Sequence, residues 1–311
     1  MTKNKGINVL SLFDGMSCGQ IALERVGVKV NNYYASEIDK YAMSVTKHNY
    51  PNTKHIGSVV DIKSSDFPKI DLLFGGSPCQ NFSFAGNGMG MSTKDKIEIL
   101  SLEHYIQLKA EKHEFSGESY LFWEFVRVLK EIQKINPNVR FLLENVRMKK
   151  KWKDLISSIL DVEPININSN LVSAQSRNRL FWTNIKGLEQ PKDKGLVVSD
   201  ILEEDAEFTT EYPRWLDLNF GEKKRKDYVA YTNQKAECLA KSMYKGQTRS
   251  YCKNTKGEVH KYTRAELERL QTVPVGYTKD VSFTQSCMML GNGWTVDVIA
   301  HIFKNLKFDN E

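Results

Sequence analysis

The stretch Asp71-Leu-Leu-Phe-Gly-Gly-Ser-Pro-Cys-Gln-Asn-Phe-Ser-Phe84 joins a short apolar run to a glycine pair and a Pro-Cys dipeptide. The run Leu72–Phe74 ends at the glycine pair, which predicts a buried strand with a turn and a close backbone approach at its end. Cys79 follows that strand on a segment stiffened by Pro78, so its thiol is a candidate nucleophile. A structural cysteine beside a turn is the alternative interpretation, and the rest of the chain has to distinguish the two.

The composition is that of an ordinary globular protein. The chain has 311 residues, 26% charged and 41% hydrophobic, which suits one large domain with a smaller one attached. No apolar run approaches the length of a membrane span, so we expect no membrane partner and a cytoplasmic location. The five cysteines form no Cys-x-x-Cys pair, which argues against a disulfide framework and against a zinc or other metal site.

The basic residues are clustered. The net charge is +6 and the pI about 8.8. Lysines gather at 149–153 and 223–226, and a third stretch, 241–264, mixes Lys and Arg with tyrosines. Such a mixture suits a phosphate backbone, although a lysine cluster can also be a plain solvated surface.

The first seventy residues predict a nucleotide-type site. Residues 7–13 read as a strand, 14–19 as a glycine-bearing turn that opens a helix, and 33–36 as a second strand that ends at Glu37. Backbone amides at the helix start and an acid after the second strand are typical of such sites. The full Gly-x-Gly-x-x-Gly is missing, which fits a ligand without a pyrophosphate; an ordinary strand-to-helix turn is the alternative.

Strands and helices continue to alternate along most of the chain, which predicts an α/β fold. We expect strands at 55–62, 72–74, 139–143, 165–172 and 179–185, and helices within 97–112, 121–132, 152–160, 263–270 and 296–306. The alternation fades between residues 186 and 262, named the inserted segment below. Two parts of one domain, 1–185 and 263–311, therefore flank a smaller domain, 186–262.

The motifs, taken in order, resemble the cytosine-C5 DNA methyltransferase family over nearly the whole chain. They are Phe13–Gly19, Glu37-Ile38, Asp61-Ile62, Gly75–Cys79, Glu144-Asn145-Val146, Gln175–Arg179, Arg264–Gln271 and Gly291-Asn292-Gly293. Each motif alone is common by chance, but all of them in this order and with this spacing are specific for the family. The sequence around Phe13 and Cys79 also resembles that of the animal de novo methyltransferase branch. The loop after Cys79 instead resembles that of bacterial restriction-modification enzymes. A stand-alone bacterial or phage enzyme is the expectation.

The resemblance implies a Rossmann-like class I methyltransferase domain that depends on S-adenosylmethionine, with a mixed, mostly parallel sheet and a small target-recognition domain. Its activity would be transfer of a methyl group to C5 of a flipped cytosine in double-stranded DNA, through a covalent adduct between Cys79 and C6. Glu144 matches the acid that bonds N3 and the exocyclic amine of cytosine. Arg177 matches the side chain that contacts the base, and Arg179 its structural companion.

The resemblance also implies a set of cofactor residues: Phe13, Asp14, Gly15, Ser17, Cys18, Gly19, Glu37, Ile38, Asp61, Ile62, Pro78, Leu121, Asn292 and Trp294. The turn would hold the amino-acid moiety, Glu37 the ribose hydroxyls and Asp61 the adenine amino group. Ile38, Ile62 and Leu121 could equally be ordinary core residues.

Double-stranded DNA is the partner that the resemblance implies, with a cognate restriction endonuclease as a second candidate. The inserted segment would read the major groove, and the loop 80–90 would close behind the flipped base. Two alternatives stay open. One is a tRNA cytosine methyltransferase on the same scaffold, although its Cys-Phe-Thr signature is not found here. The other is a catalytically silent DNA-binding relative, although the Pro-Cys and Glu-Asn-Val residues are intact.

Overall fold

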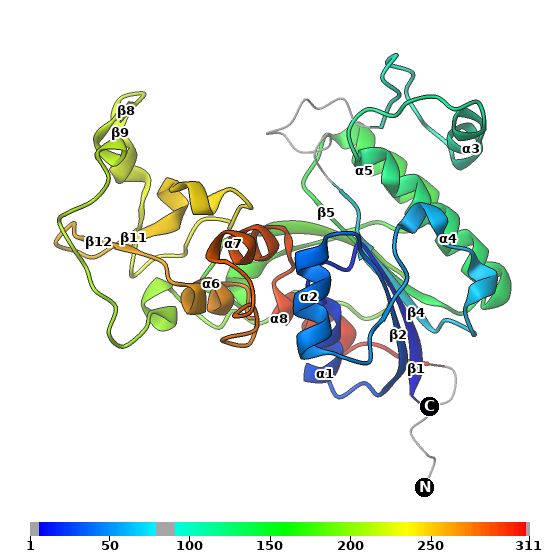
Figure 1. Cartoon of the computed structure of the whole chain (residues 1–311), viewed down its shortest axis with the longest axis horizontal. Coiled ribbons are helices and arrows are strands. Elements are labelled where there is room, and N and C mark those ends of the chain that lie inside the picture. Colours follow the sequence, from blue (N-terminus) through cyan, green and yellow to red (C-terminus); the bar gives the residue numbers. More distant parts are fainter. Residues whose placement is uncertain (1–5, 79–90, 309–311) are drawn as a thin grey trace, which may run out of the picture.

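A seven-stranded sheet forms the centre of the molecule, with strand order β3-β2-β1-β4-β5-β7-β6 (Figure 1). This computed structural model describes residues 6–78 and 91–308, so the predicted nucleophile Cys79 lies outside the described residues. The strands are β1 Ile7–Leu12, β2 Val30–Ser36, β3 Lys54–His55, β4 Leu72–Gly76, β5 Arg140–Val146, β6 Ile165–Asn168 and β7 Asn178–Thr183. The pairs among β1 to β5 are parallel, and β7 runs antiparallel to both β5 and β6. The predicted mixed, mostly parallel α/β fold is therefore confirmed.

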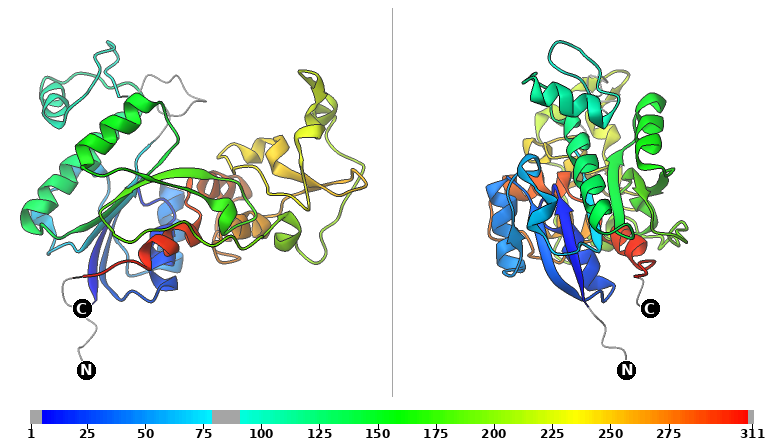
Figure 2. Two further views of the ribbon diagram at one scale, coloured as in Figure 1. Left: turned by 180° about the vertical axis from the view of Figure 1, so that it is seen from behind. Right: turned by 90° about the vertical axis from the view of Figure 1, so that its right-hand side faces the viewer.

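Helices cover both faces of this sheet (Figures 1 and 2). Alternate residues of the strands point to opposite faces, so Val9 and Leu72 join one hydrophobic cluster while Leu10 and Leu73 join the other. The first cluster includes residues of α1, α7 and α8, and the second includes residues of α4 and α5. The helices are α1 Cys18–Arg25, α2 Lys40–Asn49, α3 Leu102–Ala110, α4 Phe122–Ile135, α5 Lys150–Leu160, α6 Arg264–Leu270, α7 Phe283–Asn292 and α8 Val296–Phe303.

The strand order reverses between β1 and β4, because the chain first runs outward from β1 to β3 and then returns to β4. The carboxyl ends of the parallel strands meet at this reversal, which is where open α/β sheets bind ligands. Gly75 permits the close approach there, since a Cβ on it would lie 2.5 Å from the carbonyl oxygen of Leu12. The close approach was predicted, but the strand continues through Gly76 instead of turning at the glycine pair.

The structure differs from the sequence prediction at three elements. The expected strand 55–62 is only Lys54–His55, and a 3-10 helix, Val59–Asp61, follows it. Gly57 has φ +77° and the Ser58 side chain accepts from the amide of Val60, so the backbone turns before a longer strand can form. Helices α2 and α7 were not expected.

The inserted segment lies at the far end of the long axis, beyond α6 and α7 (Figure 1). It is built from 3-10 turns and short strands: β8 Asn219–Phe220, β9 Lys223–Lys224, β10 Ala230–Tyr231, β11 Tyr251–Lys253 and β12 Val259–Lys261. Leu216 and Val229 belong to a small cluster of its own, whereas Val198 and Leu239 join the main core. The domain division at residues 185 and 263 stays a prediction.

Among the described residues, 6–78 and 91–308, no helix has the length and apolarity needed to cross a membrane. Nor do three or more His, Cys, Asp or Glu side chains of the same residues gather where they could hold a metal ion.

Candidate active site

The turn after β1 is held by Glu37 from the end of β2. The Glu37 carboxylate accepts from the amide of Gly15 at 2.7 Å and from the amides of Ile38 and Asp39 at 2.7 and 2.8 Å. Phe13 and Ser17 have φ values of 56° and 61°, a left-handed conformation that costs energy in residues with a side chain. Such strain persists where surrounding bonds fix the backbone, which is what Glu37 does here.

Asp14 and Cys18 support this turn from inside. Asp14 accepts from the Tyr33 hydroxyl at 2.7 Å and also from the hydroxyl of Ser17. Burial raises the pKa of Asp14 to about 6, and the neighbouring charge of Glu37 adds to the effect. Burial likewise raises the pKa of the Cys18 thiol to about 12, so Cys18 is a poor nucleophile.

The other predicted cofactor residues surround the same strand ends with different exposures. Ile38 is 76% exposed, an unusual state for a large apolar side chain, and it directly follows Glu37. Asp61 is exposed and Ile62 is buried. Phe13 and Leu121 are partly buried against the α4 side of the core, Gly19 is buried, Pro78 is half-buried, and Asn292 is exposed.

Arg127 on α4 fixes the loop that carries Asp61, a contact that sequence reasoning missed. Its guanidinium donates to the carbonyls of Ile62 and Val59 at 3.0 and 3.1 Å. Glu124, fully buried, accepts from Arg127 Nε at 2.6 Å and from the Tyr105 hydroxyl at 2.5 Å. A charged residue within the apolar pattern of the predicted helix was the signal that could have revealed this network.

Glu144, on β5, is held from two sides. Its Oε1 lies 3.0 Å from Nε of Arg179 on β7, and its Oε2 accepts from the Trp294 indole at 2.9 Å. Gly76 leaves the space for this arrangement, because a Cβ there would lie 2.9 Å from Glu144 Oε2. Arg179 and Trp294 thus hold one buried carboxylate, and Gly76 leaves room for it, at the edge where the parallel strands end.

Asn145 ties the Glu144 strand to the segment that leads to Cys79. Its buried amide donates to the Ser77 carbonyl at 3.2 Å and to the Ser77 hydroxyl at 3.1 Å. Ser77 is followed by Pro78, the last described residue of this segment. The Glu-Asn dipeptide therefore orients a carboxylate and anchors the backbone next to the predicted nucleophile.

Arg177 has other partners than Glu144. Its buried guanidinium donates to the carbonyls of Leu239, Gly291 and Gly293 at 3.1, 3.2 and 2.9 Å, and to Cys238 Sγ at 3.3 Å. Burial lowers the pKa of Arg177, and the neighbouring charge of Arg179 lowers it further. Arg177 therefore joins the inserted segment to the loop that carries Trp294, while Arg179 contacts the carboxylate.

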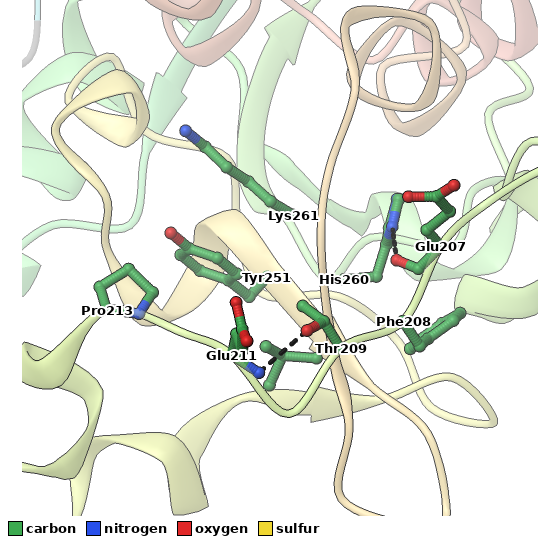
Figure 3. Close-up of a pocket in the computed structure, with 9 residues that line it drawn as sticks. Glu207, Phe208, Thr209, Glu211, Pro213, Tyr251, His260 and Lys261 are labelled. Carbon is green, nitrogen blue, oxygen red and sulfur yellow. Dashed lines mark hydrogen bonds between the residues drawn. The ribbon is translucent and has the colours of Figure 1, made fainter.

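Two cavities differ sharply in size. The one lined by Glu144, Arg177, Arg179 and Trp294 has a volume of about 10 Å³, room for roughly one water molecule. A larger pocket of about 740 Å³ lies in the inserted segment, lined by residues that include Tyr251 (Figure 3). The lining of this larger pocket contains none of the predicted site residues.

Comparison with known proteins gives relatives of one kind. The type II methyltransferase M1.ScrFI of Lactococcus lactis subsp. cremoris is 26% identical over 98% of this chain and 79% of its own length. The orphan methyltransferase M.SPRI of Bacillus phage SPR is 37% identical, over 35% of this chain and 25% of its own length.

Solved structures share the fold. The Entamoeba histolytica methyltransferase EhMeth superposes with a TM-score of 0.69 at 16% identity, covering 98% of this chain and all of its own (100%). The Dnmt2 methyltransferase of S. pombe gives 0.68 at 17% identity, over 96% of this chain and 97% of its own. At such identities the likeness establishes the fold alone.

A family match extends the relationship from the first strand to the end of the described chain. Residues 7–308 match the family described as C-5 cytosine-specific DNA methylase. That span contains the Glu37 turn, the oriented Glu144 and the two arginines Arg177 and Arg179, and it includes the inserted segment. By this match the chain is a methyltransferase and belongs to the C-5 cytosine-specific DNA methylases.

Proposed function

We propose that this enzyme methylates C5 of cytosine in double-stranded DNA, using S-adenosylmethionine as the methyl donor. The observation that carries the proposal is the Glu144 carboxylate, fixed by Arg179 and Trp294 beside the Ser77–Pro78 segment that leads to Cys79. A carboxyl group fixed in this way can accept from the exocyclic amine of a cytosine and, in its protonated form, donate to N3.

The residues around the β1 turn suit the methyl donor. The left-handed backbone of the turn and the backbone N–H groups at the start of the following helix can face the carboxylate of the donor's amino-acid moiety. The exposed Ile38 side chain offers an apolar surface to the purine ring. Glu37 and Asp61 are the acids that would accept from ribose hydroxyls and from the adenine amine. When bound, S-adenosylmethionine supplies an electrophilic methyl group on a sulfonium.

The protein's part in the chemistry begins at Cys79. Its thiolate adds to C6 of the cytosine, forming an S–C6 bond, and the ring electrons move toward C5, which becomes nucleophilic. Glu144, in its protonated form, donates its proton to N3 and so neutralises the negative charge that develops there. After C5 has gained the methyl group, loss of the C5 proton and elimination of the Cys79 thiolate restore the aromatic ring. We assign the proton loss to water.

Arg179 is the better candidate for the arginine beside the base. It reaches Glu144, whereas the guanidinium of Arg177 is occupied by three backbone carbonyls. The sequence prediction gave these two side chains the opposite roles. We therefore assign stabilisation of the bound base to Arg179 and the structural role to Arg177.

The inserted segment is proposed to bind the DNA. Its β8–β9 hairpin projects toward the top of Figure 1, the same side as the α3 region of the larger part. Phe220 at the hairpin is 61% exposed, and Lys223 and Lys224 beside it are exposed as well. Exposed lysines next to aromatic and apolar side chains suit the phosphate backbone and groove of a duplex, with affinity that falls as salt rises.

Covalent trapping tests the proposal. A duplex carrying 5-fluorocytosine blocks the final elimination, so the protein should form a stable protein–DNA complex when S-adenosylmethionine is present. Peptide mapping should place the crosslink on Cys79, and Cys79→Ser should form no complex while still binding the duplex. A crosslink on another residue, or none with an active preparation, would contradict the mechanism.

The nucleic acid is tested in parallel. Transfer from labelled S-adenosylmethionine to duplex DNA and to tRNA should label the DNA, and bisulfite sequencing should then show the modified positions. Label in tRNA alone would favour the tRNA alternative. Binding of the duplex without any transfer would favour a catalytically silent relative.

A further inference from the structure

Cys238, a residue of the inserted segment, lies next to both arginines of the candidate site. Its Sγ is 3.3 Å from Nη1 of Arg177 and 3.8 Å from Nη2 of Arg179. The proposed mechanism does not use this thiol, and the inserted segment was expected to contact DNA rather than the base-binding carboxylate. The contact therefore needs its own explanation.

The backbone around Cys238 is fixed to residues 174–176, which directly precede Arg177 and strand β7. The amide of Ala236 donates to the Ala174 carbonyl at 2.7 Å, and the amide of Ser176 donates back to the Ala236 carbonyl at 2.8 Å. The amide of Leu239 donates to the buried side chain of Gln175 at 2.8 Å. These bonds on both sides of Cys238 determine where its sulfur lies.

The resulting contacts close into a ring, which we name the carboxylate ring. Cys238 accepts from Arg177 and Arg179; Arg179 contacts Glu144; Glu144 accepts from the Trp294 indole; and Arg177 donates to the carbonyl of Gly293, the residue before Trp294. The ring links the inserted segment, the base-binding carboxylate and the loop before α8. A change at one member can therefore move the others.

The charges around Cys238 favour an anionic sulfur. Arg177 and Arg179 carry two positive charges, and Glu144 is the one carboxylate in the carboxylate ring. Burial raises the pKa of the Cys238 thiol, but the two guanidinium groups outweigh it, so the pKa lies below its usual 9.0. By contrast, burial raises the pKa of Cys252 in the same segment to about 12.

We propose that Cys238 is a positioning residue for Glu144: its sulfur accepts from both Arg177 and Arg179, holds the two guanidinium groups together and thereby keeps Arg179 against the carboxylate. The proposal rests on the role of Glu144 in the proposed function. It also gives the inserted segment a direct connection to the chemical step, since a displacement of Cys238 changes the support of Glu144.

Paired substitutions test the positioning role. Cys238→Ala removes the acceptor and should lower kcat for methyl transfer about tenfold, while the Kd values for duplex and for S-adenosylmethionine stay within about twofold. Cys238→Ser restores a neutral acceptor and should recover part of the loss. Cys252→Ser, a buried cysteine outside the carboxylate ring, is the matched control and should leave kcat unchanged. An unchanged kcat in Cys238→Ala would overturn the proposal.

Thiol alkylation tests the lowered pKa of Cys238 without any methyl transfer. In a Cys79→Ser background, iodoacetamide should modify Cys238 at lower pH than Cys252, as read by mass spectrometry of peptides. The charged groups near Cys238 are Arg177, Arg179 and Glu144 in the carboxylate ring. The neighbouring Glu237 pairs with Arg249, which donates to the Cys238 carbonyl. Adding Arg179→Gln should shift the alkylation profile of Cys238 to higher pH.

These readouts separate the two proposals. If Cys79→Ser is inactive while Cys238→Ala is fully active, the positioning role fails and the proposed function stands. If the native protein transfers no methyl group to DNA, the proposed function fails, and the alkylation profile still tests whether the two arginines lower the pKa of Cys238. If Cys238 reacts only in the same high pH range as Cys252, the arginines do not act on its sulfur and the proposed contact is overturned.

Discussion

At the scale of single residues, Asn145 shows how one buried amide connects the two motifs of the candidate site. It donates to both the carbonyl and the hydroxyl of Ser77, two residues before Cys79. Asn145→Ala removes both bonds and leaves a buried carbonyl without its donor. We expect the free energy of unfolding to fall by about 1–3 kcal/mol and kcat to fall by about tenfold or more, because the Ser77–Pro78 segment loses its anchor. Urea unfolding and single-turnover methyl transfer measure the two effects.

Asn184 offers a matched control for Asn145. Its side chain also makes two backbone bonds, donating to the Val139 carbonyl at 2.9 Å and accepting from the Phe141 amide at 2.9 Å. These bonds lie at the opposite end of β5 from Glu144. Asn184→Ala should therefore lose comparable stability and keep kcat, and an equal loss of kcat in both variants would contradict the anchoring role of Asn145.

At the scale of elements, α4 positions the loop of the 3-10 helix Val59–Asp61 through Arg127. The flat guanidinium spans the carbonyls of Val59 and Ile62, which a lysine cannot do although it keeps the charge beside Glu124. Arg127→Lys should therefore weaken S-adenosylmethionine binding by about tenfold while kcat at saturating donor changes less than twofold. Calorimetric titration with S-adenosylmethionine measures the Kd, and saturation kinetics measure kcat.

Arg269→Lys is the corresponding control on α6. Arg269 also spans two carbonyls, those of Ile201 and Leu202, at 2.9 and 3.1 Å. Its two bonds support the inserted segment, whereas those of Arg127 support the loop of Val59 and Ile62. Equal weakening of donor binding in both lysine variants would show that Arg127 acts through general stability.

The elements that the sequence predicted well are those with a strong hydrophobic period. Helix α4 was expected because its apolar residues recur on one face, and the strands of the sheet were expected because they are short apolar runs. Helix α2 was missed because only Ala42, Val45 and Thr46 of its ten residues are buried, so its apolar stripe is weak. Its signal was the cap at Asp39, whose carboxylate accepts from the amides of Tyr41 and Ala42.

The candidate site was predicted as a set of residue types but not as a set of contacts. Glu144 and Arg179 were named from local motifs, and the structure brings them together through the antiparallel pairing of β5 and β7. The Trp294 indole reaches Glu144 across 150 positions of sequence, and Cys238 comes from a segment without a motif. Such long-range pairing follows from tertiary packing, which local patterns do not encode.

At the scale of the whole molecule, a buried ion pair fastens the inserted segment to α6. Both ring nitrogens of His260 on β12 face acceptors, the Glu207 carbonyl at 2.9 Å and the Glu266 carboxylate at 2.8 Å. Glu266 is fully buried and also accepts from the Glu203 amide at 3.0 Å. Because both ring nitrogens face acceptors, the surroundings favour the charged, doubly protonated imidazole.

This pair makes stability depend on pH in a defined direction. Burial lowers the pKa of His260, but its bonds to Glu266 and Glu207 outweigh burial, so the pKa lies above 6.5. A raised pKa stabilises the folded state fully below 6.5, and the stabilisation is lost as the pH rises through the raised value. Burial raises the pKa of Glu266 and the bonds from His260 and the amides outweigh it, so its stabilisation is present above 4.5 and lost at lower pH.

His260→Gln should therefore lower the free energy of unfolding most between pH 4.5 and 6.5, by about 2 kcal/mol. The loss should become progressively smaller as the pH rises above this range. Urea unfolding of the two proteins across this range measures the difference. His55 provides the control of opposite sign: burial, and then the charge of Lys47, lowers its pKa below 6.5. The native protein should lose stability relative to His55→Gln as the pH falls. If both variants showed the same slope, the charge on His260 would not be what fastens the inserted segment to α6, since only a group protonated in the fold gains stability from acid.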